Sequence, residues 1–280
     1  MIPEALRLSS RRRDPVVWHL LQLSQDLDTD DAVTESLIHI RIDRQTSPEI
    51  LARIKRRILS SLADVKVAVE DWQAMRDKAM EIADELAESR SGLDEKELFE
   101  AREFFKWLAD DHFTFLGYRE YEIRPGDGER VLAPVEESGL GLMRSSHSPS
   151  QARPLSELSG EAHASREQVS TIIITKTNGR ATVHRDGYMD YISIFRFDED
   201  GRISGEKRII GLFTSGAYIR RCQDTPLVRV KVQRVLQESG LRPGSHAGKA
   251  LLHIQETLPR DELFQADVEE LLQLSVGILD

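Results

Sequence analysis

The stretch MDYISIFRFDEDGRISGEKRIIGLF, residues 189–213, contains two apolar-rich runs on either side of the turn Asp198–Gly201. Apolar residues at alternate positions are typical of β-strands with one buried face, and Asp and Gly are common where antiparallel strands are joined. Just upstream, STIIITKT (170–177) and RATVHR (180–185) flank Asn178–Gly179, a dipeptide that favours a type I′ hairpin turn. The sequence therefore predicts an antiparallel meander.

The region before this meander combines a helix, an extended segment and a loop. Asp94 and Glu97 have the spacing of an N-terminal capping box, and apolar residues then follow a helical period to about Asp111. FTFLGYREYEI (113–123) reads as an extended segment that ends at the turn PGDG. Residues 138–167 are rich in Ser, Gly and Pro without periodicity, which predicts a long loop.

The N-terminal part of the chain predicts a strand–helix–strand unit. SLIHIRI (36–42) alternates apolar and polar residues, as a half-buried strand does. Ser47 and Pro48 suit the start of a helix, and VKVAVEDW (65–72) alternates again. A further helix is expected from Trp72, with its acidic residues facing solvent.

The C-terminal residues predict helices only. After Pro226 the apolar period becomes helical, and Gly240 suits the C-terminal cap of that helix. Ser245 and Asp267 suit the N-caps of two more helices, and Glu270 stands at the capping-box position of the second. Because helices and strands segregate along the chain instead of alternating, the fold class is α+β.

Composition excludes several classes of protein. With 38 Lys and Arg against 48 Asp and Glu, the net charge of the 280 residues is −10, which argues against nucleic acid and anionic membrane as partners. Apolar runs are far shorter than the ~20 residues that span a bilayer. A single cysteine, Cys222, rules out an internal disulfide, and we expect a cytoplasmic protein. Arg11–Arg13 is interpreted as a solvated leader, with a small anion patch as the alternative.

No nucleotide-binding motif is complete. GLGL at Gly139–Leu142 lacks the third glycine of a dinucleotide fingerprint. Gly244–Ala250 resembles a phosphate loop but is one residue short between its glycines, and it ends in Ala where a metal-binding hydroxyl belongs. Both stretches are expected to be structural.

Four features carry chemically versatile side chains, and each has a plainer explanation. His246 and His253 are seven residues apart without a third metal ligand, so we expect neither to bind metal. His112 follows two acids and suits either a proton carrier or, as we favour, a helix C-terminal cap or a hydrogen bond to the next strand. His184–Asp190 suits an anion-binding loop or, as we favour, a polar turn. Cys222 lies beside two arginines but lacks a partner that would make it a nucleophile.

Several blocks together resemble the large, multidomain NAD-dependent glutamate dehydrogenases of bacteria. They are FFKWLADDHFTFLGYREYEI (104–123), the block from Met189 to Tyr218, GSHAGKALLHIQETLPRDELF (244–264) and the final EELLQLSVGILD. The blocks stand in the same order as in that family, and the resemblance covers most of the chain.

The resemblance implies an organisation and a place in a larger enzyme. That family carries ACT-like and PAS-like sensory modules ahead of a catalytic half, which deaminates L-glutamate to 2-oxoglutarate and ammonium with NAD. The implied units are a leader (1–35), the end of an ACT-like unit (36–91), a PAS-like sheet domain (92–225) and a helical connector (226–280). The family's nicotinamide site and catalytic lysine lie in the half that this chain does not cover, so no catalytic, cofactor-binding or metal residue is assigned here.

The leading hypothesis from sequence is therefore a regulatory and oligomerisation fragment that is inactive alone and binds no cofactor. Its expected partners are the rest of its own polypeptide, other subunits of a homo-oligomer and a small effector such as an amino acid. The alternative is a ligand-free scaffold that holds subunits together. A weaker third hypothesis is a free-standing enzyme that uses His112 and its neighbouring acids.

Overall fold

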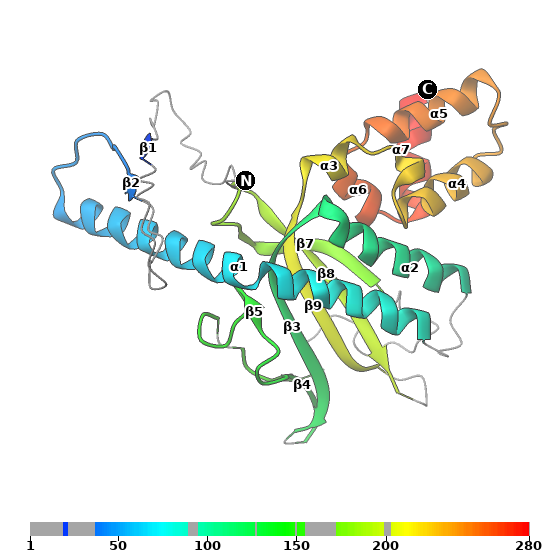
Figure 1. Cartoon of the computed structure of the whole chain (residues 1–280). Coiled ribbons are helices and arrows are strands. Elements are labelled where there is room, and N and C mark those ends of the chain that lie inside the picture. Colours follow the sequence, from blue (N-terminus) through cyan, green and yellow to red (C-terminus); the bar gives the residue numbers. More distant parts are fainter. Residues whose placement is uncertain are drawn as a thin grey trace, which may run out of the picture.

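The fold is an antiparallel sheet with helices packed across it and a group of short helices beside it (Figure 1). This computed structural model describes residues 19–21, 37–88, 95–126, 128–148, 150–154, 172–198 and 203–279. The helices are α1 (Pro48–Glu88), α2 (Glu95–Trp107), the π-turn η1 (Leu108–His112), α3 (Ser215–Ile219), the 3-10 turn η4 (Cys222–Asp224), α4 (Val228–Glu238), α5 (His246–Thr257), α6 (Arg260–Gln265) and α7 (Val268–Leu279). The strands are β1 (His19–Leu21), β2 (Leu37–His39), β3 (Phe113–Pro125), β4 (Arg130–Pro134), β5 (Leu140–Gly141), β6 (Arg153–Pro154), β7 (Ile172–Arg180), β8 (Tyr188–Phe197) and β9 (Ile203–Phe213).

The large sheet has the strand order β6-β4-β3-β9-β8-β7, and β5 adds to β3. All of its pairings are antiparallel, from Phe113 opposite Phe213 in β3 and β9 to Asp190 opposite Gly211 in β8 and β9. The meander β7-β8-β9 is confirmed, and the α+β class with it. Part of the expected loop over 138–167 instead forms the short strands β5 and β6, while residues 155–171 lie outside the described ranges.

The predicted hairpin turn at Asn178–Gly179 is wrong. Both residues belong to β7, neither has a positive φ, and the chain turns later, within residues 181–187. Within that turn Ala181 and Val183 are buried in a cluster with Ala68 of α1 and Leu212 of β9. Burial of these apolar side chains favours the later turn, and Asn178–Gly179 forms an irregularity in the register of β7 against β8.

The second strand of the predicted strand–helix–strand unit is also wrong. Residues 65–72 lie in the middle of α1, a single helix that Ser47 caps through its Oγ and the Ile50 N–H (3.3 Å). A helix places residues four apart on one face, so Val65 and Val69 share a face even though they also fit an alternating pattern. No Gly or Pro interrupts residues 49–88, and the helix continues until the described segment ends.

The main core lies between the sheet, the second half of α1, and α2. Met75, Ala79 and Ile82 of α1 are fully or almost fully buried, as are Phe104 and Phe105 of α2. A second set of aromatic contacts joins the sheet to the C-terminal helices, with Phe213 of β9 stacked on Phe264 of α6 at 4.9 Å between ring centroids. The sheet and the C-terminal helices therefore share one core.

The predicted caps of the C-terminal helices are confirmed. Gly240 has φ +67°, and Ser245 accepts a hydrogen bond from the Gly248 N–H (3.0 Å). Asp267 and Glu270 form a reciprocal box, in which the Glu270 N–H donates to Asp267 (2.8 Å) and the Asp267 N–H donates to Glu270 (3.1 Å). Asp94 of the other predicted box lies outside the described residues.

Candidate functional site

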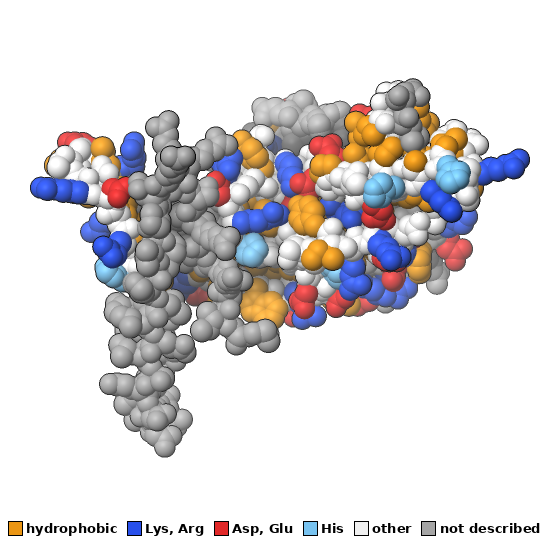
Figure 2. Space-filling view, turned by 90° about the horizontal axis from the view of Figure 1, so that it is seen from above, with side chains coloured by type: hydrophobic (Ala, Val, Ile, Leu, Met, Phe, Trp, Pro, Cys, Tyr) orange, Lys and Arg blue, Asp and Glu red, His pale blue; other side chains and the backbone are white. Residues whose placement is uncertain are grey.

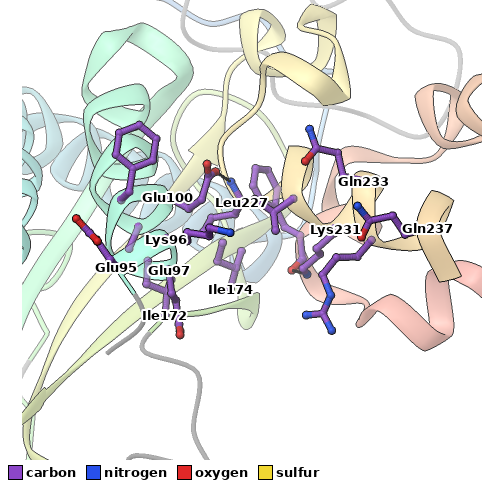
Figure 3. Close-up of a pocket in the computed structure, with 15 residues that line it drawn as sticks. Glu95, Lys96, Glu97, Glu100, Ile172, Ile174, Leu227, Lys231, Gln233 and Gln237 are labelled. Carbon is purple, nitrogen blue, oxygen red and sulfur yellow. Dashed lines mark hydrogen bonds between the residues drawn. The ribbon is translucent and has the colours of Figure 1, made fainter. Parts of the chain in front are cut away.

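A groove of about 1020 Å³ runs between α2, α4 and the edge strand β7. In Figure 3 the α2 side chains stand on one side and the α4 side chains on the other, with Ile172 and Ile174 of β7 between them. Leu227 and Phe264 extend this apolar floor. The groove therefore lies where the sheet meets the C-terminal helices, since Phe264 also belongs to their shared core.

The two walls of the groove carry different charges. Glu95, Glu97 and Glu100 of α2 line one wall together with Lys96. The α4 wall carries Lys231 and Arg234, with the amides of Gln233 and Gln237 between and beyond them. A ligand with a positive group at one end and a negative group at the other would meet an opposite charge on each wall.

Leu227, at the start of α4, has an unusual backbone conformation. Its φ is +65°, a region in which a branched side chain is strained. The Glu100 carboxylate holds it there by accepting the Leu227 N–H (3.0 Å) and pairing with Arg229 (2.8 Å). Strained residues that their neighbours hold in place cluster at binding sites and switches, so Leu227 marks this groove as a candidate site.

Lys231 is the most deeply placed cation of the groove. Its Nζ donates hydrogen bonds to the carbonyl oxygens of Phe264 (2.6 Å) and Ala266 (2.8 Å). Burial lowers the pKa of its ammonium group to about 8, and the carboxylates of Asp267 and Glu270 oppose that shift. Because its N–H groups donate to these carbonyls, Lys231 connects α4 to α6. Arg234 is therefore the more accessible positive group of the α4 wall.

A second charged cluster connects β7 and β8 to α6. Lys176 bridges the buried carboxylate of Asp190 (2.5 Å) and the carboxylate of Asp261 (2.8 Å), and Tyr218 donates to Asp261 (2.9 Å). Burial raises the pKa of Asp190, and the ion pair with Lys176 opposes that rise. Asp190 also accepts the Phe213 N–H (3.2 Å), so its hydrogen bonds are used within the fold.

Of the predicted loop His184–Asp190, residues 184–187 lie in a turn, and Tyr188–Asp190 begin β8. Arg185 donates to the Phe213 carbonyl (3.1 Å), and Asp186 accepts from Arg180 (2.8 Å). His184 adopts φ +72°, and burial lowers its pKa below the usual value.

His112 and Cys222 both have structural surroundings. His112 is buried and stacks on Trp107 (4.5 Å between ring centroids), whose carbonyl lies 3.0 Å from Nδ1. That contact is a hydrogen bond at the end of the helix, as the sequence predicts. Burial raises the pKa of the Cys222 thiol to about 11, the opposite of what a reactive cysteine needs.

The remaining sequence candidates also serve the fold. The Gly141 N–H donates to Asp71 (2.7 Å) while Gly141 pairs with Gly117 in the sheet. Gly248 packs so closely that a Cβ there would lie 2.1 Å from the Arg242 carbonyl oxygen. Among the described residues, no group of His, Cys, Asp and Glu that could hold a metal occurs, His246 and His253 included. Arg11–Arg13 lies outside the described ranges.

Sequence reasoning missed the groove completely. Glu100, Leu227 and Arg234 belong to a helix before the sheet and to residues after it, and nothing local relates them. One signal was available, because Leu227 directly follows Pro226 where the helical period begins. It shows where α4 starts and gives no information about what α4 faces.

Comparisons with known proteins agree with one another. Residues 225–280, which contain α4 to α7, match the family described as glutamate dehydrogenase, helical motif 1. Over 94% of its length the chain is 40% identical to the NAD-specific glutamate dehydrogenase of Halomonas elongata. Over 89% it is 36% identical to the NAD-specific glutamate dehydrogenase of Pseudomonas aeruginosa, and the protein of that name from Mycobacterium tuberculosis is 23% identical over 88%.

The match covers only a small part of these relatives. The chain spans 16% of the length of the Halomonas protein and 15% of the Pseudomonas protein. It is therefore similar to one segment of an NAD-specific glutamate dehydrogenase, which confirms the resemblance at that level. Among the described helices, none combines the length and the apolar composition that spanning a bilayer requires.

Proposed function

We propose that this chain is a regulatory and assembly segment of an NAD-dependent glutamate dehydrogenase and that it is not catalytic alone. The whole enzyme would convert L-glutamate, NAD and water to 2-oxoglutarate, ammonium and NADH. The observation that carries the proposal is the alignment of 94% of this chain with 16% of such an enzyme. The groove supports a binding role, since its two walls carry Glu and Lys or Arg side chains over an apolar floor.

Within this proposal, residues 92–225 form a PAS-like module and residues 226–280 the helical connector that follows it. Support for the PAS-like module comes from the antiparallel meander with β3 on its far side and helices across one face. The ACT-like interpretation of residues 36–91 is not retained, because it needs a second strand where α1 is helical.

The proposed mechanism is a linkage between the groove and the rest of the enzyme. A ligand that binds one arrangement of α2 and α4 more tightly than another increases the population of that arrangement. The catalytic part of the enzyme responds if its activity depends on which arrangement is populated. The opposite charges of the walls suit a zwitterionic amino acid, whose ammonium would face α2 and whose carboxylate would face Arg234.

The expected partners are the remainder of the polypeptide and further subunits of a cytoplasmic homo-oligomer. Nucleic acid is not among them. Figure 2 shows Lys and Arg side chains interspersed with Asp and Glu on the face that it displays, whereas a nucleic-acid surface gathers basic residues.

A thermal-shift screen of the chain tests the sensing role. We expect one or more amino acids to raise the melting temperature, while their 2-oxo acid counterparts, which lack the ammonium group, have no effect. A ligand of the folded state adds RT ln(1 + [L]/Kd), about 2.7 kcal/mol at a hundred times Kd. Arg234→Gln should abolish the shift, whereas Lys249→Gln, an equal charge loss on an exposed residue of α5, should preserve it.

Two results would contradict the proposal. Glutamate-dependent reduction of NAD by the purified chain would show that it is catalytic. A screen in which no amino acid raises the melting temperature would contradict the sensing role and leave the second candidate function, a ligand-free scaffold. The observation that favours a scaffold is the set of exposed apolar side chains on α1, which include Leu51, Val69 and Trp72.

A further inference from the structure

The first half of α1 extends away from the sheet. In Figure 1 this part of the helix reaches beyond the strands on the side of β1 and β2, while its second half crosses the sheet. None of the residues 48–60 is buried, and the first buried residue of the helix is Ser61. We call residues 48–63 the arm.

An apolar stripe begins on the arm and continues onto the packed half of α1. Its members are spaced by three or four residues over about three heptads, the pattern of a coiled-coil seam. They are Leu51, Ile54, Ile58, Leu62, Val65, Val69 and Trp72. Four remain strongly exposed, with Leu51 at 43%, Leu62 at 36%, Val69 at 57% and Trp72 at 46%.

This stripe is separate from the face that packs on the sheet. At about 100° per residue, it lies roughly 90° around the helix from the line of Asp64, Ala68 and Met75, which are buried. Of the stripe, Val65 alone packs against a core cluster, at its edge beside Ala68 and Leu116. A row of apolar residues this long on the surface indicates a binding partner.

The charges of α1 indicate which partner fits. Over the stretch that two antiparallel copies share, residues 48–61 carry four basic and one acidic side chain, a net charge of +3, whereas residues 62–75 carry one basic and three acidic ones, a net charge of −2. A second copy of α1 laid antiparallel puts each half beside the half of opposite sign. A parallel copy would put like charges together along the whole seam.

We propose that α1 pairs with α1 of a second copy of this chain, antiparallel, through the stripe from Leu51 to Trp72. This rests on the assembly role proposed above and specifies its surface. The twofold axis passes near Leu62, so that Leu51 faces the second copy's Trp72 and Ile54 faces its Val69. Two-fold pairing of one surface with itself is the commonest way in which soluble proteins assemble.

Disulfide trapping of the chain distinguishes the possible arrangements. We expect Leu62→Cys to form a covalent dimer on mild oxidation, because the two cysteines meet near the axis, within the 4.4–6.8 Å between Cα atoms that a disulfide spans. Leu51→Cys alone should stay monomeric, since antiparallel pairing separates its two copies by about 30 Å. A mixture of Leu51→Cys and Trp72→Cys chains should form a mixed covalent dimer.

The controls are matched to the same helix. Ala63→Cys is exposed at the same level of α1 but faces away from the stripe, and the unmodified chain contains only the buried Cys222, so neither should crosslink. Circular dichroism confirms that each variant is folded. Self-crosslinking of Leu51→Cys would establish a parallel pair, and a monomeric Leu62→Cys chain would show that something else covers the stripe; either result overturns the proposal.

This outcome is independent of the thermal-shift screen. Trapping reports only on α1, and the screen reports only on ligand binding to the folded chain. A chain that pairs through α1 but binds no ligand is a scaffold. A chain that binds an amino acid but does not pair through α1 is a sensor that assembles through another surface.

Discussion

The two halves of α1 are both helical, but they differ in the burial of their side chains and in their contacts with the sheet domain. From Asp64 onward the helix is held by buried side chains and by hydrogen bonds from the sheet domain, in which Asp64 accepts from His147 (2.6 Å) and Asp71 accepts from Arg144 (2.5 Å). In the arm, residues 48–63, Ser61 is the only buried residue. Because isolated helices are marginal in water, the packed half stabilises the arm as a helix, and the arm is free to contact other molecules.

This difference shows how one element can serve both folding and assembly. Residues that pack the core lie on one line of the helix, and residues that remain exposed lie on another, so a substitution can affect one function without the other. Three predictions test this division of α1.

The largest effect is expected for Met75→Ala. Met75 is fully buried beside Gly141 of β5, and truncating such a side chain removes its burial and leaves a cavity, at a cost of about 3 kcal/mol. Leu51→Ala, an equally apolar truncation on the arm, should change the free energy of unfolding by less than about 0.5 kcal/mol. Urea denaturation at low protein concentration measures both. Equal losses would mean that the arm is part of the folded core.

A smaller effect is expected for Asp71→Asn, and it should depend on pH. The Arg144 guanidinium beside Asp71 holds the pKa of that carboxyl below its usual value, and the Gly141 N–H contributes in the same direction. A depressed pKa means that the ionised carboxylate favours the folded state. The stabilisation is therefore fully present above the unfolded-state pKa of about 4 and is lost as the pH falls through the folded-state value.

Urea titrations at pH 7 and near pH 3 measure this dependence. We expect the free energy of unfolding of the wild-type chain to exceed that of Asp71→Asn by about 2 kcal/mol at pH 7. This difference should be smaller at pH 3. Glu122→Gln, whose partner Arg124 is two residues away on β3, is the surface control and should change little at either pH. A difference between wild type and Asp71→Asn that stays constant with pH would show that the carboxylate charge is unimportant.

The smallest effect is expected for Ser47→Ala, which removes the cap of the arm. Loss of an N-cap costs the helix about 1 kcal/mol. Since the arm adds little to the core, the change should appear as faster amide hydrogen exchange in the first turns of α1, with almost no change in global unfolding. Exchange rates near Met75 should stay the same, and faster exchange there would mean that the two halves open together.

Local chemistry explains which parts of this fold were predictable. Ser47, Gly240, Ser245 and the pair of Asp267 and Glu270 act on backbone groups within four residues of themselves, and their sequence signals were correct. The meander was predictable because its register follows alternation within neighbouring strands.

The errors and omissions depend on contacts between distant residues. Val65 and Val69 fit both a strand and a helix, and the choice depends on Ala68 and Asp71 meeting β3, β5 and the residues after β7. Asn178–Gly179 favours a turn locally, but β7 continues through it with a register shift between Lys176 and Arg180, and the chain turns only beyond it, where Ala181 is buried. The groove combines residues more than a hundred positions apart, such as Glu100 and Leu227, which no periodicity relates.

The central claim is that the stripe on α1 assembles the chain while the packed half folds it. Sedimentation equilibrium over a concentration series tests this most directly, with Val69→Glu as the disruptive variant and the exposed Ala63→Glu as its control. We expect the wild type and Ala63→Glu to approach twice the 31.8 kDa mass of one chain, and Val69→Glu to remain at 31.8 kDa with an unchanged unfolding transition. A wild type that stays at the mass of one chain, or a dimer that persists in Val69→Glu, would contradict the claim.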